Sequence, residues 1–473
     1  MERLTAIPVL KDTSCNRVKA RRWLPLAAAL FAGCAVFAFP QAGSVPGPVP
    51  GDDLASQLAW LYANAQSNTR YIIEVSGGES IPPQALPAGR RNVTITLYGI
   101  GEGHTVSLSG AGSLFTVSSG VTLILDGNIV LSGGGNGNGG NGGKLVQVNN
   151  GGTLVMNPGS QVSGSSGGGV SVHSGGTFVM HGGAIVNNTG STGGAGRHGI
   201  MGGLGGNGGV SNWGAFTMHG GTISGNSGGA GSDDGSGGSG GVGGVANWGT
   251  FTMHGGEISG NSGGDGVSSG LGGSGAVFNA GVFALRGGEI SGNSGGAGGG
   301  NRWGVRGGIG GVNNSGGFAM YGGEISGNSG GAGDGGWGGV GGVSNSGRFT
   351  LHGGTISGNS IGAGDGDWGG VGAVFTVGTF TMHGGTISGN DSGVGVWSVR
   401  YGGTSYGVFR MTGGVIYGSA AGANLGNSGG ALRMLGAAGT ARLGTFNAAG
   451  FFVLSGALGD TNETIHVVDG VLR

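Results

Sequence analysis

A short motif that recurs along the middle of the chain constrains the fold more than any other feature. The unit F-x-M-x-G-G-x-I occurs eight times, with leucine in place of methionine in two copies. The copies begin at Phe178, Phe216, Phe251, Phe283, Phe318, Phe349, Phe380 and Phe409, so the interval from one copy to the next is not constant. Because the motif is preserved while its spacers vary, the sequence predicts stacked repeats with insertions of different length.

Each unit has the alternation of short β-strands. Phe216 and Met218 are two residues apart and therefore share one face of a strand, whereas Thr217 and His219 lie on the other face. The glycine pair ends this strand, and a second short strand buries Ile223. A third short strand precedes each motif phenylalanine. Three strands and three corners per unit are typical of one coil of a parallel β-helix, which is stable only when coils stack about 4.8 Å apart.

Composition supports this all-β interpretation and excludes other fold classes. Glycine accounts for 130 of 473 residues, and only 9% of the residues are charged. Glycine costs roughly 1 kcal/mol relative to alanine inside a helix, which excludes a mainly helical fold. The chain has ten prolines and no strict Gly-X-Y period, so it is not a collagen.

The spacing of the repeats indicates where the insertions lie. A degenerate copy of the motif at Leu154 lies nearer to Phe178 than any two later copies lie to each other, so the longer units carry glycine-rich loop insertions.

The N-terminal region before the repeats predicts a signal segment, a linker and a cap. Four basic residues precede the apolar run Leu24–Phe39, which is typical of a secretory signal. Cys34 ends a sequence that resembles a bacterial lipobox and would be lipidated, whereas cleavage after Ala38 is the alternative. Farther along, the spacing of Leu54, Leu58 and Leu61 predicts an amphipathic helix over Asp53–Asn64, capped by Asp52 or Asp53, that covers the first coil.

We therefore expect five segments. They are a signal segment (1–38), a Pro/Gly linker (39–52), an N-terminal cap with irregular first coils (53–177), the repeated coils (178–420), and C-terminal coils with a cap (421–473). The expected strands outside the repeats are Val93–Leu97, Val121–Leu125, Phe451–Leu454 and Thr464–Val468.

Charge and cysteine content limit the partners. Cleavage before Cys34 removes six of the 20 basic residues and two of the 21 acidic ones, which leaves a net charge of −5. No basic patch for nucleic acid remains, and membrane contact is expected only through the possible lipid anchor. The only cysteines are Cys15 and Cys34, so the exported chain cannot form an internal disulfide. The sequence indicates no cofactor.

The repeats also carry a family resemblance. The string FTMHGGTISGN, the segment from Leu54 to Leu125 and the closing TFNAAGFFVLSGALGDTNETIHVVDG resemble the right-handed parallel β-helix repeat proteins of spirochaete cell surfaces. The repeats are more distantly similar to those of chlamydial polymorphic membrane proteins. This resemblance implies a right-handed β-helix of the pectin-lyase-like superfamily and export to the bacterial surface. It does not imply a ligand.

The fourth motif position would form a histidine row on the outer face. Stacking would align His181, His219 and His254 about 5 Å apart. Neutral imidazoles in such a row could share Zn²⁺ or Cu²⁺. Duplication of one ancestral unit predicts the same row without a metal, and Arg286 and Tyr321 interrupt it.

The position after the glycine pair would form a glutamate row of Glu257, Glu289 and Glu324. Adjacent carboxylates repel each other, which can raise one pKa and create an acid/base pair. The alternative is an ordinary salt bridge to Arg286. No cluster of basic residues beside this row suggests a polysaccharide lyase site.

Tryptophans in the spacers are the strongest candidates for a binding surface. They are Trp303, Trp337, Trp368 and Trp397, with Asp334, Asp365 and Asp367 as nearby hydrogen-bond acceptors. Rings repeated along a rod can stack on sugar rings, since glycine lets the backbone approach a ligand closely. The alternative is that each indole covers its own coil or the loop beside it.

Asparagines at the coil corners are expected to be structural. One row comprises Asn188, Asn226, Asn261, Asn293, Asn328, Asn359 and Asn390. A second comprises Asn212, Asn247, Asn279, Asn314 and Asn345. Stacked amides satisfy the backbone of turns and each other.

These observations predict an exported, non-enzymatic rod of the bacterial surface or envelope, structural or adhesive, that binds glycans or host and matrix proteins through its spacer loops. If the chain is not lipid-anchored, it is periplasmic or secreted. The alternative is a pectin-lyase-like carbohydrate-active enzyme, a lyase or hydrolase. Polar residues that recur with the repeat suit multivalent binding better than catalysis, which requires a local cluster of acids and bases.

Overall fold

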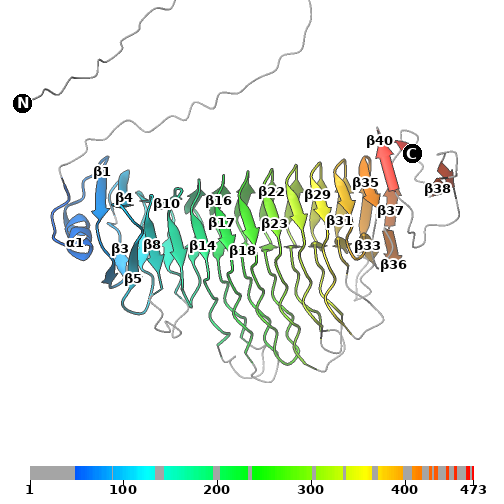
Figure 1. Cartoon of the computed structure of the whole chain (residues 1–473), viewed down its shortest axis with the longest axis horizontal. Helices are drawn as coiled ribbons and strands as arrows, with labels where there is room; N and C mark the ends of the chain where they lie inside the picture. Colours follow the sequence, from blue (N-terminus) through cyan, green and yellow to red (C-terminus); the bar gives the residue numbers. More distant parts are fainter. Residues whose placement is uncertain are drawn as a thin grey trace, which may run out of the picture. The chain divides into compact units, whose positions relative to one another are not determined.

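The described part of the protein is a β-solenoid with one helix at its N-terminal end (Figure 1). All of it belongs to the compact unit Gly43–Arg473. A computed structural model describes residues 48–87, 89–133, 143–194, 203–232, 237–300, 305–333, 337–364, 371–397, 407–417, 425–428, 431–434, 444–446, 452–454, 465–468 and 471–472. The predicted all-β fold of stacked parallel coils is confirmed. The signal segment 1–38 and Cys34 lie outside the described residues.

Each complete coil contributes one strand to each of three sheets, and β40 and β41 extend one of these sheets at the C-terminal end. Sheet A contains β1 (Arg70–Val75), β4 (Val93–Gly99), β7 (Val121–Leu125), β10 (Thr153–Met156), β13 (Thr177–Met180), β16 (Ala215–Met218), β19 (Thr250–Met253), β22 (Val282–Leu285), β25 (Gly317–Met320), β28 (Arg348–Leu351), β31 (Thr379–Met382), β34 (Val408–Met411) and β37 (Ala431–Met434). Sheet B contains β2 (Glu79–Ile81), β5 (His104–Leu108), β8 (Ile129–Ser132), β11 (Gln161–Ser163), β14 (Ala184–Val186), β17 (Thr222–Ser224), β20 (Glu257–Ser259), β23 (Glu289–Ser291), β26 (Glu324–Ser326), β29 (Thr355–Ser357), β32 (Thr386–Ser388), β35 (Gly414–Tyr417), β40 (Ile465–Val468) and β41 (Val471–Leu472). Sheet C contains β3 (Gln84–Ala85), β6 (Phe115–Val117), β9 (Val146–Val148), β12 (Val170–Val172), β15 (Val210–Asn212), β18 (Val245–Asn247), β21 (Val277–Asn279), β24 (Val312–Asn314), β27 (Val343–Asn345), β30 (Val374–Thr376), β33 (Val394–Trp397) and β36 (Leu425–Ser428).

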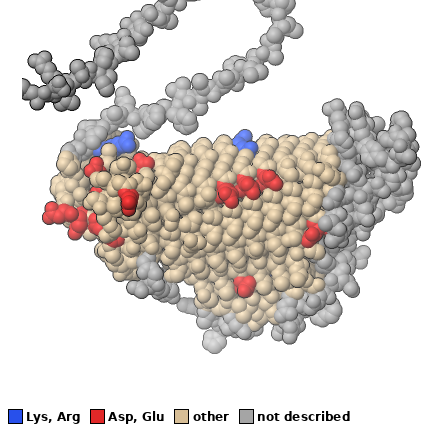
Figure 2. All heavy atoms as spheres, viewed as in Figure 1, with Lys and Arg blue, Asp and Glu red and all other residues tan. Residues whose placement is uncertain are grey.

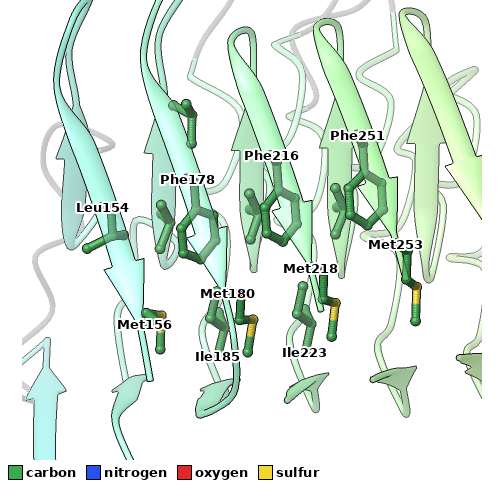
Figure 3. Close-up of a cluster of buried hydrophobic side chains, with 14 of the residues drawn as sticks. Leu154, Met156, Phe178, Met180, Ile185, Phe216, Met218, Ile223, Phe251 and Met253 are labelled. Atoms are coloured by element: carbon green, nitrogen blue, oxygen red, sulfur yellow. The ribbon is translucent and has the colours of Figure 1, made fainter. Parts of the chain in front are cut away.

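The core consists of side chains that stack on their counterparts in the next coil (Figure 3). Phe178 pairs with Phe216 and Met180 with Met218 in the register of sheet A, and all four side chains are buried. The phenylalanine rings form one continuous stack from Phe178 to Phe409, with centroids 4.5 to 4.9 Å apart. In-register stacking of identical side chains therefore explains why the motif is constant.

Steric constraints explain why the motif requires glycine at the second position of its glycine pair. Gly221, the second of its pair, has φ of +89°, a left-handed conformation that favours glycine. A Cβ there would also lie 2.7 Å from the Met180 Cε in the preceding coil. The chain can therefore pass from sheet A to sheet B at this corner only if the residue at the position of Gly221 has no side chain.

The N-terminal helix α1 (Leu54–Asn64) caps the solenoid as predicted. The Asp53 carboxylate accepts a hydrogen bond from the Ser56 backbone N–H, and Leu54, Leu58 and Leu61 are buried. The Leu54 N–H donates to the Glu79 carboxylate of β2 at 3.0 and 3.1 Å. This contact ties the start of the helix to the first coil.

The C-terminal end of the solenoid differs from a continued parallel stack. β40 pairs antiparallel with β35, and β41 pairs antiparallel with β40. β38 (Gly444–Phe446) and β39 (Phe452–Leu454) form a separate antiparallel pair. The strands expected near Phe451–Leu454 and Thr464–Val468 exist, but they do not form additional parallel coils.

The insertions between sheets B and C form a second ordered layer, which we call the glycine layer. Each insertion has an outgoing arm after sheet B and a return arm before sheet C, for example residues 227–232 and 237–244 between β17 and β18. Backbone hydrogen bonds link the two kinds of arm alternately along the stack. The chain of bonds runs from Gly241 N–H to Gly229 O, Gly264 to Gly241, Gly273 to Gly264, Gly296 to Gly273, Gly308 to Gly296, and Gly331 to Gly308, at 2.8 to 3.0 Å. The insertions expected as loops are thus a backbone-bonded array.

A period of three explains why the arms pack this way. Return arms repeat X-Gly-Gly, as in the segment from Leu204 to Gly209, and three residues per turn is the period of an extended polyproline-type helix. Both glycines of this repeat lie where neighbouring arms approach, because a Cβ on Gly240 would overlap Gly264 O and one on Gly241 would overlap Gly206 O. The outgoing arms are packed as closely, since a Cβ on Gly264 would lie 1.9 Å from Gly229 O and one on Gly331 would lie 1.9 Å from Gly296 O. The glycine layer therefore has no room for side chains at these positions.

Candidate binding surfaces

The two asparagine rows are hydrogen-bonded ladders inside the solenoid. In the first row each Nδ2–H donates to the Oδ1 of the next coil's asparagine at 2.9 to 3.0 Å, from Asn188 to Asn390. Each side chain from Asn226 on also donates to the carbonyl of a buried isoleucine, as from Asn226 to Ile185 O at 2.8 Å. The second row continues from Asn212 to Asn345 and ends on Thr376 Oγ1. Because these amides are buried and bonded, they present no surface to a ligand.

The histidine row is an exposed stack of rings at the corner between sheets A and B. His181 and His219 are 5.2 Å apart and His219 and His254 are 5.0 Å apart, with nearly parallel planes. Burial and the neighbouring His219 lower the pKa of His181, and burial, His219 and Arg286 lower the pKa of His254. Stacked rings hold their nitrogens side by side rather than aimed at one point. Accordingly, no group of three potential ligands that could hold a metal occurs among the described residues.

The stack continues past the expected interruption. The Arg286 guanidinium lies 4.9 Å from the centroid of the Tyr321 ring, and Tyr321 stacks on His352 at 4.7 Å. Within the described residues no ion pair joins Arg286 to a glutamate, so the expected salt bridge does not form. A cation–π contact keeps the arginine in the ladder instead.

The glutamate row lines an open groove on the outer face of sheet B. Glu257, Glu289 and Glu324 are consecutive register partners, flanked by Thr222 and Thr355. Figure 2 shows acidic residues gathered in a short row on an otherwise largely uncharged face. The groove has a volume of about 620 Å³ and is otherwise lined by glycines of the motif pairs. Ser357 Oγ donates to Glu324 Oε1 at 3.2 Å. The groove thus offers carboxylates without a closed pocket around them.

The predicted tryptophan surface is only partly within the described residues. Trp303, Trp368, Asp334, Asp365 and Asp367 lie outside them, as does the side chain of Trp397. Trp337 lies in a return arm and is half-buried, with the Arg306 guanidinium 4.1 Å from its ring centroid. One face of this ring is therefore covered.

Trp397 does not belong to the row of Trp337. Its backbone lies in strand β33, where it pairs with Ser428, whereas Trp337 pairs with Arg306 in the glycine layer. β33 begins at Val394, soon after the corner at Asn390, so this coil has no room for an inserted arm. The two tryptophans therefore belong to different elements, although each lies 12 residues before the next motif phenylalanine.

A pair of stacked tryptophans, Trp213 and Trp248, was not predicted from the sequence. Trp213 and Trp248 follow directly after Asn212 and Asn247, at the corner between sheets C and A. Their rings stack at 4.7 Å with an interplanar angle of 5°, and 43% and 39% of these residues remain exposed. The signal was the tripeptide Asn-Trp-Gly in two successive units, at a position whose asparagine had already been assigned to a row.

In-register stacking changes what such aromatic rows can bind. In the stacked pairs His181–His219, Trp213–Trp248 and Tyr321–His352 each ring faces its partner in the neighbouring coil, so mainly ring edges face solvent. Sugar rings stack on aromatic faces, whereas edges contact other aromatic or aliphatic side chains. The ladders therefore present a different surface from the row of free faces that the sequence suggested.

No family model matches the chain, and searches of curated proteins and of solved structures found nothing similar. Within the described residues, no helix combines the length and apolar character required to cross a membrane.

Proposed function

We propose that the chain is an exported, non-enzymatic β-helix protein of the bacterial surface or envelope, with a structural or adhesive role. The observation that carries this proposal is the register of the surface side chains. Histidines, glutamates and tryptophans each recur at equivalent positions in stacked coils. A periodic surface gives many weak contacts in a row, which favours multivalent attachment over a single reaction centre.

The N-terminal segment supports the location, and the resemblance to spirochaete surface proteins agrees with it. Four basic residues followed by the apolar run Leu24–Phe39 are typical of a secretory signal. Lipidation at Cys34 would anchor the rod to a membrane. Incorporation of labelled fatty acid in cells, lost in Cys34→Ala, is the expected result. An unmodified N-terminus at Phe39 in the native protein would show cleavage after Ala38 instead.

The glutamate groove is the observation that favours the rival function, a carbohydrate-active enzyme. Three carboxylates in register supply the residue type that glycoside hydrolysis uses. The groove is open, however, and the described residues place no lysine or arginine in its lining. These features favour a solvated acidic row over an acid/base pair.

One experiment separates the two functions. The purified protein is tested for binding to glycan and matrix-protein panels and, in parallel, for degradation of the same polysaccharides. We expect retention on some ligands without release of sugar. Degradation that is lost in Glu289→Gln but kept in Ser291→Ala, a change on the same face of the same strand, would instead establish an enzyme.

A further inference from the structure

The corner between sheets C and A carries an exposed apolar patch, which we call the tryptophan corner. It comprises His173, Trp213, Trp248 and Val282. His173 stacks beside Trp213 with centroids 6.2 Å apart. Val282 is 57% exposed. Its register partner is Thr250, which lies two residues after Trp248. Tryptophan edges and a branched aliphatic side chain are thus together on one surface, of the kind that marks interaction sites.

The surface beside this patch is nearly free of charge. The first position of the sheet A strands runs along the corner as Thr153, Thr177, Ala215, Thr250, Val282 and Gly317. The next member is Arg348, the first charged side chain in this row after the patch. Of the middle residues of sheet C beside it, Ser171, Ser211 and Ala246 are buried, and the partly exposed ones, Phe278, Asn313 and Ser344, are uncharged. A second copy of this surface would meet no like charge.

The patch is also central in the solenoid. Its tryptophans follow β15 and β18, the fifth and sixth strands of the 12-stranded sheet C. A two-fold axis perpendicular to the stack and passing between Trp213 and Trp248 would place each tryptophan opposite the other one of a second copy. Because the axis lies near the middle, the two antiparallel solenoids would overlap over most of their length.

We propose that two copies of the chain associate side by side and antiparallel through the tryptophan corner. The strip from Thr153 to Gly317 covers six strands about 4.8 Å apart, and a strand with its corner is about 20 Å wide. Two copies would then bury roughly 1,200 Å², the lower end of the range for specific interfaces. The dimer is accordingly concentration-dependent.

A saccharide is a poorer occupant of this corner. The face of Trp213 is covered by Trp248, and Phe278 lies 5.8 Å from Trp248 on its other side. Ring edges suit aromatic and aliphatic contacts with a protein surface.

Substitutions that introduce like or opposite charges at the tryptophan corner test the proposal. Ala215 and Thr250 are exposed register partners beside the tryptophans, and Arg348 shows that their row accepts a charged side chain. One variant carries Ala215→Glu and Thr250→Glu, and a second carries Ala215→Lys and Thr250→Lys. By sedimentation velocity over a concentration series of the full chain, we expect a monomer–dimer equilibrium for the wild type, monomers for each variant alone, and heterodimers when the two are mixed.

The control replaces exposed rings elsewhere. Trp213→Ser with Trp248→Ser should weaken association at least tenfold, whereas Tyr98→Ser with Tyr321→Ser, which removes similarly exposed rings, should not change it. A wild type that stays monomeric at the highest soluble concentration overturns the proposal. Unchanged association of the glutamate variant also overturns it. A third contrary result is that the tryptophan variant loses binding to a glycan panel while its association, measured by sedimentation, equals that of the wild type.

Discussion

The coil core and the glycine layer stack the same coils by different means. In the core, phenylalanine, methionine and isoleucine side chains touch their counterparts and fill the space between the sheets. In the glycine layer, the chain stacks by backbone hydrogen bonds between glycines, and an added Cβ would overlap a neighbouring carbonyl. The two regions share one spacing because the chain passes through both in every inserted coil.

This difference predicts opposite responses to substitution. The core gains its stability from buried apolar area, so it responds to the loss or charging of a side chain. The glycine layer is expected to be sensitive to the addition of any side chain, because its partners are backbone atoms that cannot rotate away. A glycine whose Cβ would meet open space, at an ordinary backbone conformation, should be dispensable.

The largest effect is expected in the core. Ile290 is fully buried, and Ile290→Asp would place an unpaired carboxylate there, which we expect to lower the free energy of unfolding by about 3–5 kcal/mol. Ser291→Asp, one residue later and facing outward, should change it by less than about 0.5 kcal/mol. Chemical denaturation followed by circular dichroism measures both. Equal stability of the two variants would contradict the assignment of faces.

The next effect distinguishes the two classes of glycine. A Cβ on Gly296 would lie 2.0 Å from Gly264 O, so Gly296→Ala should cost about 2–3 kcal/mol by forcing neighbouring arms apart. Gly317 begins a strand of sheet A, and a Cβ there meets nothing within 4 Å. Gly317→Ala should be neutral or stabilise by up to about 1 kcal/mol. If both changes are tolerated equally, the glycine layer is not packed as described.

The contrast also shows what could be predicted from sequence. The strands and the inward faces of Phe216 and Met218 follow from a period of two, and the helix over Leu54–Asn64 follows from its leucine spacing and Asp53. These signals are local. The glycine arms were expected as loops because the composition hides their period of three, and many of their hydrogen bonds join residues of different coils. The same limit applies to Trp213, whose partner Trp248 belongs to the next coil.

A smaller effect is expected where the ladder of sheet C is altered. Asn279 Nδ2–H donates to Asn314 Oδ1 at 2.7 Å, and Asn279 Oδ1 accepts from Asn247. Thr376 already ends this ladder by accepting from Asn345, so a hydroxyl can replace one bond. Asn279→Thr should therefore cost about 1 kcal/mol, whereas Asn279→Ala, which leaves buried amide groups unpaired, should cost about 2 kcal/mol. Denaturation of the two variants checks the order, and the reverse order would show that shape rather than hydrogen bonding dominates.

The smallest effect concerns pH and the histidine row. Burial lowers the pKa of His181, His254 and His352 below the ordinary value of about 6.5, so the unfolded chain binds protons more readily than the folded one. The stability that these neutral rings contribute is complete above that value and falls as the pH drops through it. His219 lies between His181 and His254 and lowers both pKa values through its charge. His219→Gln should therefore flatten the dependence of unfolding free energy on pH between about 7.5 and about 5, with little change at the upper end.

Hydrogen exchange of the wild type at the lower pH should show loosening beside the histidine row, while the Gly264 and Gly296 amides stay protected, because their bonds join only backbone groups. Equal loss of protection in both regions would mean that core and glycine layer open as one cooperative unit, which is the result that would most weaken the distinction between them.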